Sequence, residues 1–176
     1  MNPKILIIGP PRCGKSTMIS KLIRLYTEEN YKIFGFLTPE VKKDNNREGF
    51  DVQDICSKDR FPLARVGNYN TRFTLGKYSV FVKEFENYID TLFNIEDREI
   101  NLIIIDEIGK MELYSEKFQE LIKKLFKSNI PIIATIGEKM KHSVKDYILR
   151  LPNTKLLNLT RDNNEKVFQT ILSLLP

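Results

Sequence analysis

The sequence has few of the residues that mark several large classes of protein. It contains only two cysteines, Cys13 and Cys56, and one histidine, His142. Two cysteines so far apart form neither a disulfide framework nor a metal cluster, and a single histidine excludes a histidine-rich metal site. No apolar run is long enough to span a bilayer. The chain starts directly into an apolar run, so we expect no signal peptide, no membrane contact and a soluble, cytoplasmic protein.

Internal repeats, low-complexity stretches and linker-like segments are also absent. The 176 residues, 41% hydrophobic and 29% charged, therefore predict a single domain covering residues 1–176. The net charge of +5 leaves a nucleic-acid surface open as an alternative. The lysines are scattered and no aromatic residues interleave with them, so solvated helix faces are the favoured interpretation.

One motif is present in full. Residues 9–16 read Gly-Pro-Pro-Arg-Cys-Gly-Lys-Ser, which is the Walker A pattern G-x-x-x-x-G-K-[ST]. An apolar run at residues 4–8 precedes it, and residues 17–23 follow it with apolar residues at helical spacing. Strand, glycine-rich turn and helix form the context in which backbone N–H groups cradle phosphate oxygens. The alternative is a glycine turn that binds no ligand.

The motif predicts a nucleotide-binding loop with a defined role for two side chains. Lys15 would reach the β- and γ-phosphates of a nucleoside triphosphate, and the Ser16 hydroxyl would hold Mg²⁺. The predicted nucleotide-binding residues are Gly9, Pro10, Pro11, Arg12, Cys13, Gly14, Lys15, Ser16 and Thr17.

Strand-like apolar runs alternate with helical patterns along the rest of the chain. Strands are predicted at residues 5–8, 32–38, 102–105, 130–136 and 155–159, with a shorter one at 61–66. Helices are predicted from residue 15 to about 29, at 82–95, after a cap at Ser115, at 142–149 and around 167–172. Residues 40–43 and 50–55 flank Asp44-Asn45-Asn46 and predict a β-hairpin. The alternation predicts an α/β fold, a mainly parallel sheet flanked by helices with a hairpin insertion, and a ligand at the carboxyl ends of the strands.

Two acidic residues follow a buried strand. Asp106 comes directly after the apolar residues 102–105, which is the placement of a Walker B aspartate that binds the metal or a water on it. Glu107 comes next, and a glutamate there can orient and deprotonate water for attack on the γ-phosphate. The alternative for Glu107 is a residue at the start of a helix.

The arginines are spread along the chain and predict no compact lid, so water is a simpler phosphoryl acceptor than a second substrate. Lys110, just beyond Glu107, is the first candidate for a basic side chain that stabilises charge in the transition state. Arg47 and Arg65 come next, although a solvated surface position is the favoured interpretation for each arginine. Thr135 ends a predicted strand, where a hydroxyl either senses the γ-phosphate or caps the next turn.

The residues around Asp106 resemble a specific family. Residues 105–113, Ile-Asp-Glu-Ile-Gly-Lys-Met-Glu-Leu, resemble the signature of a family of small nucleoside-triphosphatases known from thermophilic microbes, with a human relative called cancer-related nucleoside-triphosphatase. Further stretches match its pattern in the same order, at residues 38–41, 47–50, 76–78 and 134–135. The resemblance implies a RecA-like, three-layer P-loop domain that slowly hydrolyses several nucleoside triphosphates with Mg²⁺. It carries over Lys15, Ser16, Asp106 and Glu107 as phosphate, metal and catalytic residues.

The chain departs from the family pattern at three positions. Arg12 stands where the family loop usually has glycine, and Ser16 stands where threonine is common. A glycine at position 12 can supply a positive φ, so an arginine there is either strained or accompanied by a different loop. Alternatively, its guanidinium points to solvent near the phosphates. Asn164 stands where an arginine is expected, which bears on nucleotide preference if that arginine contacts base or ribose.

The sequence as a whole predicts a Mg²⁺-dependent hydrolase that cleaves ATP, GTP, CTP and UTP to the diphosphate and phosphate. Lys15, Glu107 and Lys110 are the predicted catalytic residues, and Ser16 and Asp106 the metal ligands. The absence of an Asn-Lys-x-Asp motif after residue 107 favours loose base selection. Two alternatives are a kinase of a nucleoside, nucleotide or other small hydroxyl compound, and a nucleotide-dependent switch that binds RNA or protein.

Overall fold

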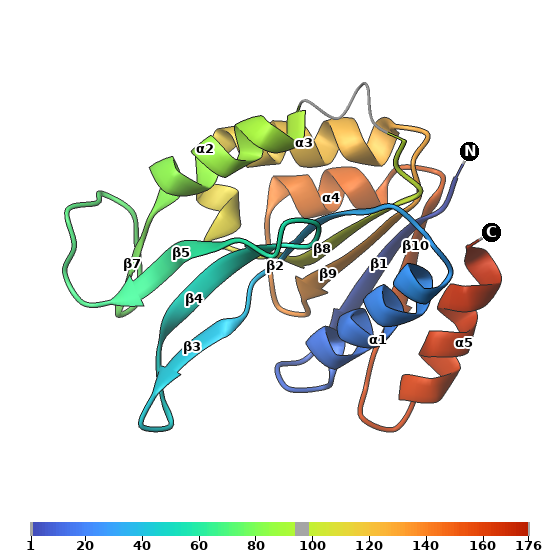
Figure 1. Ribbon diagram of the computed structural model, residues 1–176, viewed down its shortest axis with the longest axis horizontal. Coiled ribbons are helices and arrows are strands. Elements are labelled where there is room, and N and C mark those ends of the chain that lie inside the picture. The colour runs from blue at the N-terminus through green and yellow to red at the C-terminus, as the bar shows by residue number, and fades with distance from the viewer. Residues whose placement is uncertain (1, 94–98, 176) are drawn as a thin grey trace.

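A computed structural model describes residues 2–93 and 99–175, and a single mixed sheet organises them (Figure 1). Its strands follow the order β10-β1-β9-β8-β2-β4-β5-β7-β6, with β3 paired to β4. The strands are β1 Lys4–Gly9, β2 Ile33–Leu37, β3 Glu40–Lys43, β4 Asn46–Asp54, β5 Arg60–Val66, β6 Thr74–Leu75, β7 Tyr78–Val80, β8 Leu102–Ile108, β9 Ile132–Gly137 and β10 Thr154–Asn158. The helices are α1 Lys15–Glu28, α2 Val82–Phe93, α3 Glu116–Lys127, α4 Ser143–Leu149 and α5 Asn164–Leu174, with a 3₁₀ turn η1 at Glu112–Tyr114.

The five strands from β10 to β2 run parallel and form the centre of the fold. Every residue of β1 is buried, because a strand between other strands and between two helical layers has no side facing water. Ile5 and Ile7 pack into the cluster under α1 and α5, whereas Leu6 and Ile8 pack into the cluster under α2, α3 and α4. Figure 1 shows these two helical layers on opposite faces of the sheet. The predicted three-layer α/β arrangement is confirmed.

Beyond β2 the sheet becomes antiparallel, and we call strands β3 to β7 the antiparallel extension. The predicted hairpin lies there. Its turn residues Asp44 and Asn45 have φ values of 49° and 63°, a conformation that aspartate and asparagine tolerate better than most residues. The turn is so tight that Asn46 already belongs to β4, which therefore starts earlier than the predicted residue 50.

Most predicted elements are present close to their expected bounds. Ser115 caps α3, because its Oγ accepts the backbone N–H of Phe118 at 3.0 Å. Helix α2 is described to Phe93, so its predicted end at residue 95 lies outside the described residues. The short strands β6 and β7 and the turn η1 were not predicted. Within the described ranges, every helix is too short or too polar to cross a membrane.

Candidate active site

The predicted site residues lie at the carboxyl edge of the parallel strands. The loop of residues 10–14 leaves β1 there and leads into α1. Asp106 and Thr135 lie near the ends of β8 and β9, and β9 lies between β8 and β1 in the sheet. Since parallel strands end at the same edge, residues far apart in the sequence meet at this place.

The loop between β1 and α1 depends on two left-handed residues. Arg12 has a φ of 62° and Gly14 a φ of 102°. Cys13 N–H donates to the Pro10 carbonyl at 3.3 Å, which closes a turn within the loop. The Arg12 side chain is exposed. Arg12 therefore keeps the positive φ that a glycine would supply, and its guanidinium lies at the surface beside the loop.

The side chain of Lys15 folds back into this loop. Its Nζ donates to the carbonyl of Gly9 at 2.8 Å and to that of Pro10 at 3.0 Å. Ser16 and Thr17 follow on the exposed first turn of α1. An ammonium group, a helix N-terminus and a hydroxyl thus border the same loop, and each favours an anion such as phosphate.

Helix α5 contacts the loop from outside. Asn164 Nδ2 donates to the Cys13 carbonyl at 3.3 Å and to the Thr160 carbonyl at 2.8 Å. A side chain at Gly14 would approach the Asn164 amide to 3.4 Å. Asn164, which stands where the family pattern has an arginine, therefore supports the loop directly through its amide group.

Asp106 is buried beside the loop, at 6% exposure. The Thr135 hydroxyl donates to its carboxylate, and the Ser16 hydroxyl is hydrogen-bonded to the same group. Thr38 Oγ1 donates to the Asp106 carbonyl at 2.8 Å. Burial raises the pKa of Asp106, while the hydrogen bonds of Thr135 and Ser16 and the charge of Lys15 lower it. The Thr135 hydroxyl therefore donates to Asp106 and does not cap the turn that follows β9.

A β-bulge in β8 contains both Asp106 and Glu107. Regular pairing with β9 stops after Ile105 and resumes at Ile108, so Asp106 and Glu107 together oppose Thr135. Bulges re-aim side chains and are common next to active sites. Glu107 is half-buried, and its pKa is raised by burial first and by the charge of Asp106 second, against the effect of Lys15.

A third carboxyl group lies beside these two, and the sequence did not single it out. Glu112 is 4% exposed, and burial together with the charge of Glu107 raises its pKa to about 8. It belongs to the matching stretch at residues 105–113, but nothing in the sequence separates it from an ordinary exposed glutamate at the start of a helix. Its burial depends on the path of the chain after β8.

The candidate basic residues differ in their surroundings. Lys110 is exposed and follows the acidic pair closely in the chain. Arg65 is engaged elsewhere, because its guanidinium pairs with Asp51 at 2.5 Å. Arg47 pairs with Glu40. Both arginines are therefore held within the antiparallel extension by their own acidic partners.

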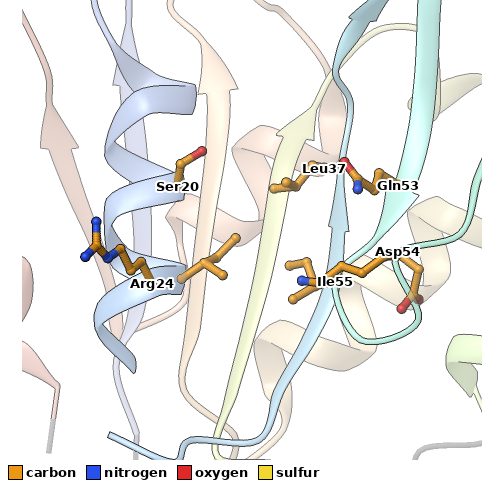
Figure 2. Close-up of a pocket in the computed structure, with 8 residues that line it drawn as sticks. Ser20, Arg24, Leu37, Gln53, Asp54 and Ile55 are labelled. Atoms are coloured by element: carbon orange, nitrogen blue, oxygen red, sulfur yellow. The ribbon is translucent and has the colours of Figure 1, made fainter. Parts of the chain in front are cut away.

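A cavity of about 180 Å³ lies between α1 and the ends of β2 and β4 (Figure 2). Figure 2 shows Ser20 and Arg24 of α1 on one side and Leu37 and Gln53 on the other. Its lining includes none of residues 9–17. Pockets that enclose organic ligands measure about 300–1,000 Å³, so a nucleoside triphosphate would lie across the loop rather than inside this cavity.

The chain matches known proteins along nearly its whole length. A family model described as NTPase matches residues 4–172. A relative named nucleoside-triphosphatase THEP1 from Methanocaldococcus jannaschii is 33% identical, covering 97% of this chain and 95% of the relative. One of the same name from a Thermotoga species is 36% identical, covering 98% and 95%.

Two solved structures have the same fold. The crystal structure of THEP1 from the hyperthermophile Aquifex aeolicus superposes with a TM-score of 0.81 at 32% identity, covering 98% of both chains. The solution structure of a human cancer-related nucleoside triphosphatase superposes with a TM-score of 0.80 at 28% identity, covering 97% of this chain and 96% of the human one.

Proposed function

This chain belongs to the NTPase family and is a nucleoside-triphosphate hydrolase, and we propose that its reaction takes place where residues 9–17 meet Asp106 and Glu107. The observation that carries this proposal is the convergence of the loop and the acidic pair at one sheet edge, where the Ser16 hydroxyl is hydrogen-bonded to the Asp106 carboxylate. The relatives are named as triphosphatases, which favours hydrolysis over the kinase and switch alternatives.

In this proposal Lys15 and the loop backbone bind the phosphates. The Lys15 ammonium already lies against the Gly9 and Pro10 carbonyls, so it needs to exchange only these acceptors for phosphate oxygens. Positioning and charge stabilisation account for most of the catalysis of phosphoryl transfer. Lys110 is exposed and follows Glu107 closely in the chain, and it is the basic residue we assign to charge developing in the transition state.

Ser16 and Asp106 form the proposed metal site. The Ser16 hydroxyl interacts with the Asp106 carboxylate, and Mg²⁺ prefers such hard oxygen ligands together with substrate phosphates. These residues therefore fit the ion. Bound Mg²⁺ would supply Lewis-acid stabilisation of the phosphate charge.

Glu107 acts on the water. As the water oxygen bonds to the γ-phosphorus, the bond from that phosphorus to the bridging oxygen breaks, and Glu107 takes the proton of the water. The diphosphate leaves with the electron pair of the broken bond. Because the sequence has no base-reading motif after Glu107, we propose that ATP, GTP, CTP and UTP are all substrates with slow turnover, and that the protein acts in the cytoplasm.

The test is phosphate release from each of the four triphosphates, with Mg²⁺ and with excess chelator. Lys15→Ala and Glu107→Gln are each expected to lower kcat at least about 100-fold, since a positioned general base alone contributes about 10²–10⁴-fold. Lys155→Ala and Glu116→Gln, at exposed positions on β10 and α3, are the matched controls. Undiminished phosphate release by Glu107→Gln would contradict the role of Glu107 as the base. Phosphate release that the chelator does not change would contradict the requirement for Mg²⁺.

A further inference from the structure

The chain turns back on itself after β8 and brings a second glutamate to Glu107. A methyl group built on Gly109 would lie 2.6 Å from Glu112 Oε2 and 3.1 Å from Glu107 Oε1. Both carboxyl groups therefore converge over this glycine. The φ of Gly109 is not in the left-handed region, so the glycine is needed for space and not for backbone conformation.

Glu112 is buried without a cationic partner. Its carboxyl group accepts the backbone N–H groups of Gly109 and of Glu112 itself. Among the described residues, the ion pairs include none to Glu112. An ionised carboxylate in such a place is costly, so burial raises the pKa of Glu112 to about 8 and the neutral acid predominates below that pH. The neutral acid has an O–H group to donate, and Glu107 carries the charge that acts most strongly on it.

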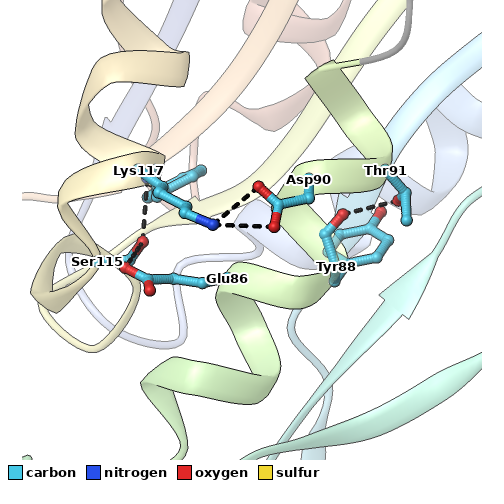
Figure 3. A network of polar contacts seen from close by, with 7 residues as sticks. Glu86, Tyr88, Asp90, Thr91, Ser115 and Lys117 are labelled. Carbon is cyan, nitrogen blue, oxygen red and sulfur yellow. Dashed lines mark hydrogen bonds and ion pairs between the residues drawn. The ribbon is translucent and has the colours of Figure 1, made fainter.

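The turn that carries Glu112 is held firmly. Leu113 N–H donates to the Gly109 carbonyl at 3.0 Å, and Ser115 N–H donates to the Glu112 carbonyl at 3.1 Å. Ser115 caps α3 and donates its hydroxyl to Glu86 of α2 at 2.9 Å (Figure 3). Helices α2 and α3 thus fix the backbone of η1, so the Glu112 side chain meets Glu107 from a rigid base.

We propose that Glu112 is a positioning residue whose carboxylic acid donates a hydrogen bond to Glu107 and holds that carboxylate in the orientation for accepting the proton of water. This role rests on the proposed function of Glu107. Glu112 keeps its own proton throughout, and the proton of the water goes to Glu107. A carboxylate with an exposed edge swings between rotamers, and holding it in one of them lowers the cost of reaching the reactive geometry.

Two variants of nearly equal volume test the proposal. Glu112→Gln keeps a donor for Glu107, whereas Glu112→Met fills the space without one. Glu112→Gln is expected to keep at least about a third of the wild-type kcat. Glu112→Met is expected to lower kcat about 10- to 100-fold at unchanged KM and unchanged nucleotide affinity. A residue that only filled space would give the two variants the same kcat.

Gly109→Ala provides an independent arm if Glu112→Met fails to fold. Its methyl group would press on both carboxyl groups, so kcat is expected to fall by a similar factor while the far-ultraviolet circular dichroism stays that of the wild type. Wild-type kcat in a folded Glu112→Met or in Gly109→Ala overturns the positioning role. Glu107→Gln distinguishes failure of this proposal from failure of the proposed function. If Glu107→Gln is inactive while Glu112→Met and Gly109→Ala keep the wild-type kcat, only the positioning role of Glu112 is contradicted. If Glu107→Gln is active, the assignment of Glu107 as the base is contradicted.

Discussion

Arg12 adopts a backbone conformation that favours glycine, with a φ of 62°. A left-handed conformation costs an L-residue about 1–2 kcal/mol, and glycine loses about 0.5–1 kcal/mol in extra unfolded-state freedom. Arg12→Gly is therefore expected to raise the free energy of unfolding by about 0.5–1 kcal/mol. Urea unfolding measures this, and Arg12→Ala, which keeps the strain, should gain little. A loss of stability in Arg12→Gly would mean that the exposed guanidinium makes a stabilising contact.

Thr135 supports Asp106 from the neighbouring strand and is fully buried. Thr135→Val keeps the shape but removes the donor, leaving a buried carboxylate short of a partner. We expect a loss of about 1–3 kcal/mol in unfolding free energy and weaker metal-dependent activity. Thr135→Ser keeps the hydroxyl and should retain most of both. Equal behaviour of the serine and valine variants in thermal unfolding would show that the hydrogen bond contributes little.

Single residues differ in how far the sequence predicts them. The positions of Lys15 and Asp106 at the sheet edge could be predicted, because each belongs to a local motif beside a recognisable strand. Asn164 could only be noted as a departure from a family pattern, since its contact with Cys13 joins residues 151 positions apart. Glu112 was missed for a similar reason: its environment depends on how the chain folds back, which local spacing does not encode.

At the level of secondary structure, long apolar segments were predicted better than short ones. The apolar runs that form β1, β8 and β9 are buried on both faces of the sheet. Such runs can be recognised from the local sequence alone, because almost every residue in them is apolar. β6 has two residues and β7 three, so neither can show a period. They pair with each other, and β7 also pairs with β5. The turn η1 is likewise too short for a helical pattern.

The junction of α2 and α3 offers a test at this scale (Figure 3). Ser115 is fully buried, accepts the Phe118 N–H and donates to Glu86. Ser115→Ala removes a cap and a buried partner, so unfolding free energy should fall by about 1–3 kcal/mol. The nearby pair of Lys117 and Asp90 is about half exposed, so Asp90→Asn should lower the unfolding free energy much less than Ser115→Ala does. Guanidinium unfolding measures the free energy of unfolding of both variants, and equal decreases for Ser115→Ala and Asp90→Asn would contradict this ranking.

For the whole molecule, the order of the parallel strands creates the site. Strand β9 lies between β1 and β8, so the loop after β1, the bulge of β8 and the Thr135 hydroxyl face one another at one edge. The alternation of strands and helices predicts a parallel sheet and this edge. It does not determine the strand order, which results from long-range packing against the two helical layers. The antiparallel extension could be predicted only as a hairpin, because its outer strands are short.

The buried Glu112 also makes the stability of the molecule depend on pH. Its pKa is near 4.5 when unfolded and about 8 when folded. Between these values the folded state holds a proton that the unfolded state has released, so stability falls as pH rises through this window and levels off above about 8. The slope from one such group approaches about 1.4 kcal/mol per pH unit. Burial raises the pKa of Asp106 and Glu107 as well, which adds a trend of the same sign.

Glu112→Gln removes one of these contributions and leaves the others in place. Urea unfolding of wild type and variant at pH 5, 6, 7 and 8 should therefore show a steeper fall for the wild type, with a difference that grows by several kcal/mol across the range. Glu116→Gln, at the exposed start of α3, is the matched control and should follow the wild-type profile. Parallel profiles for wild type and Glu112→Gln would mean that Glu112 is ionised in the folded protein, in which case it could donate no hydrogen bond to Glu107.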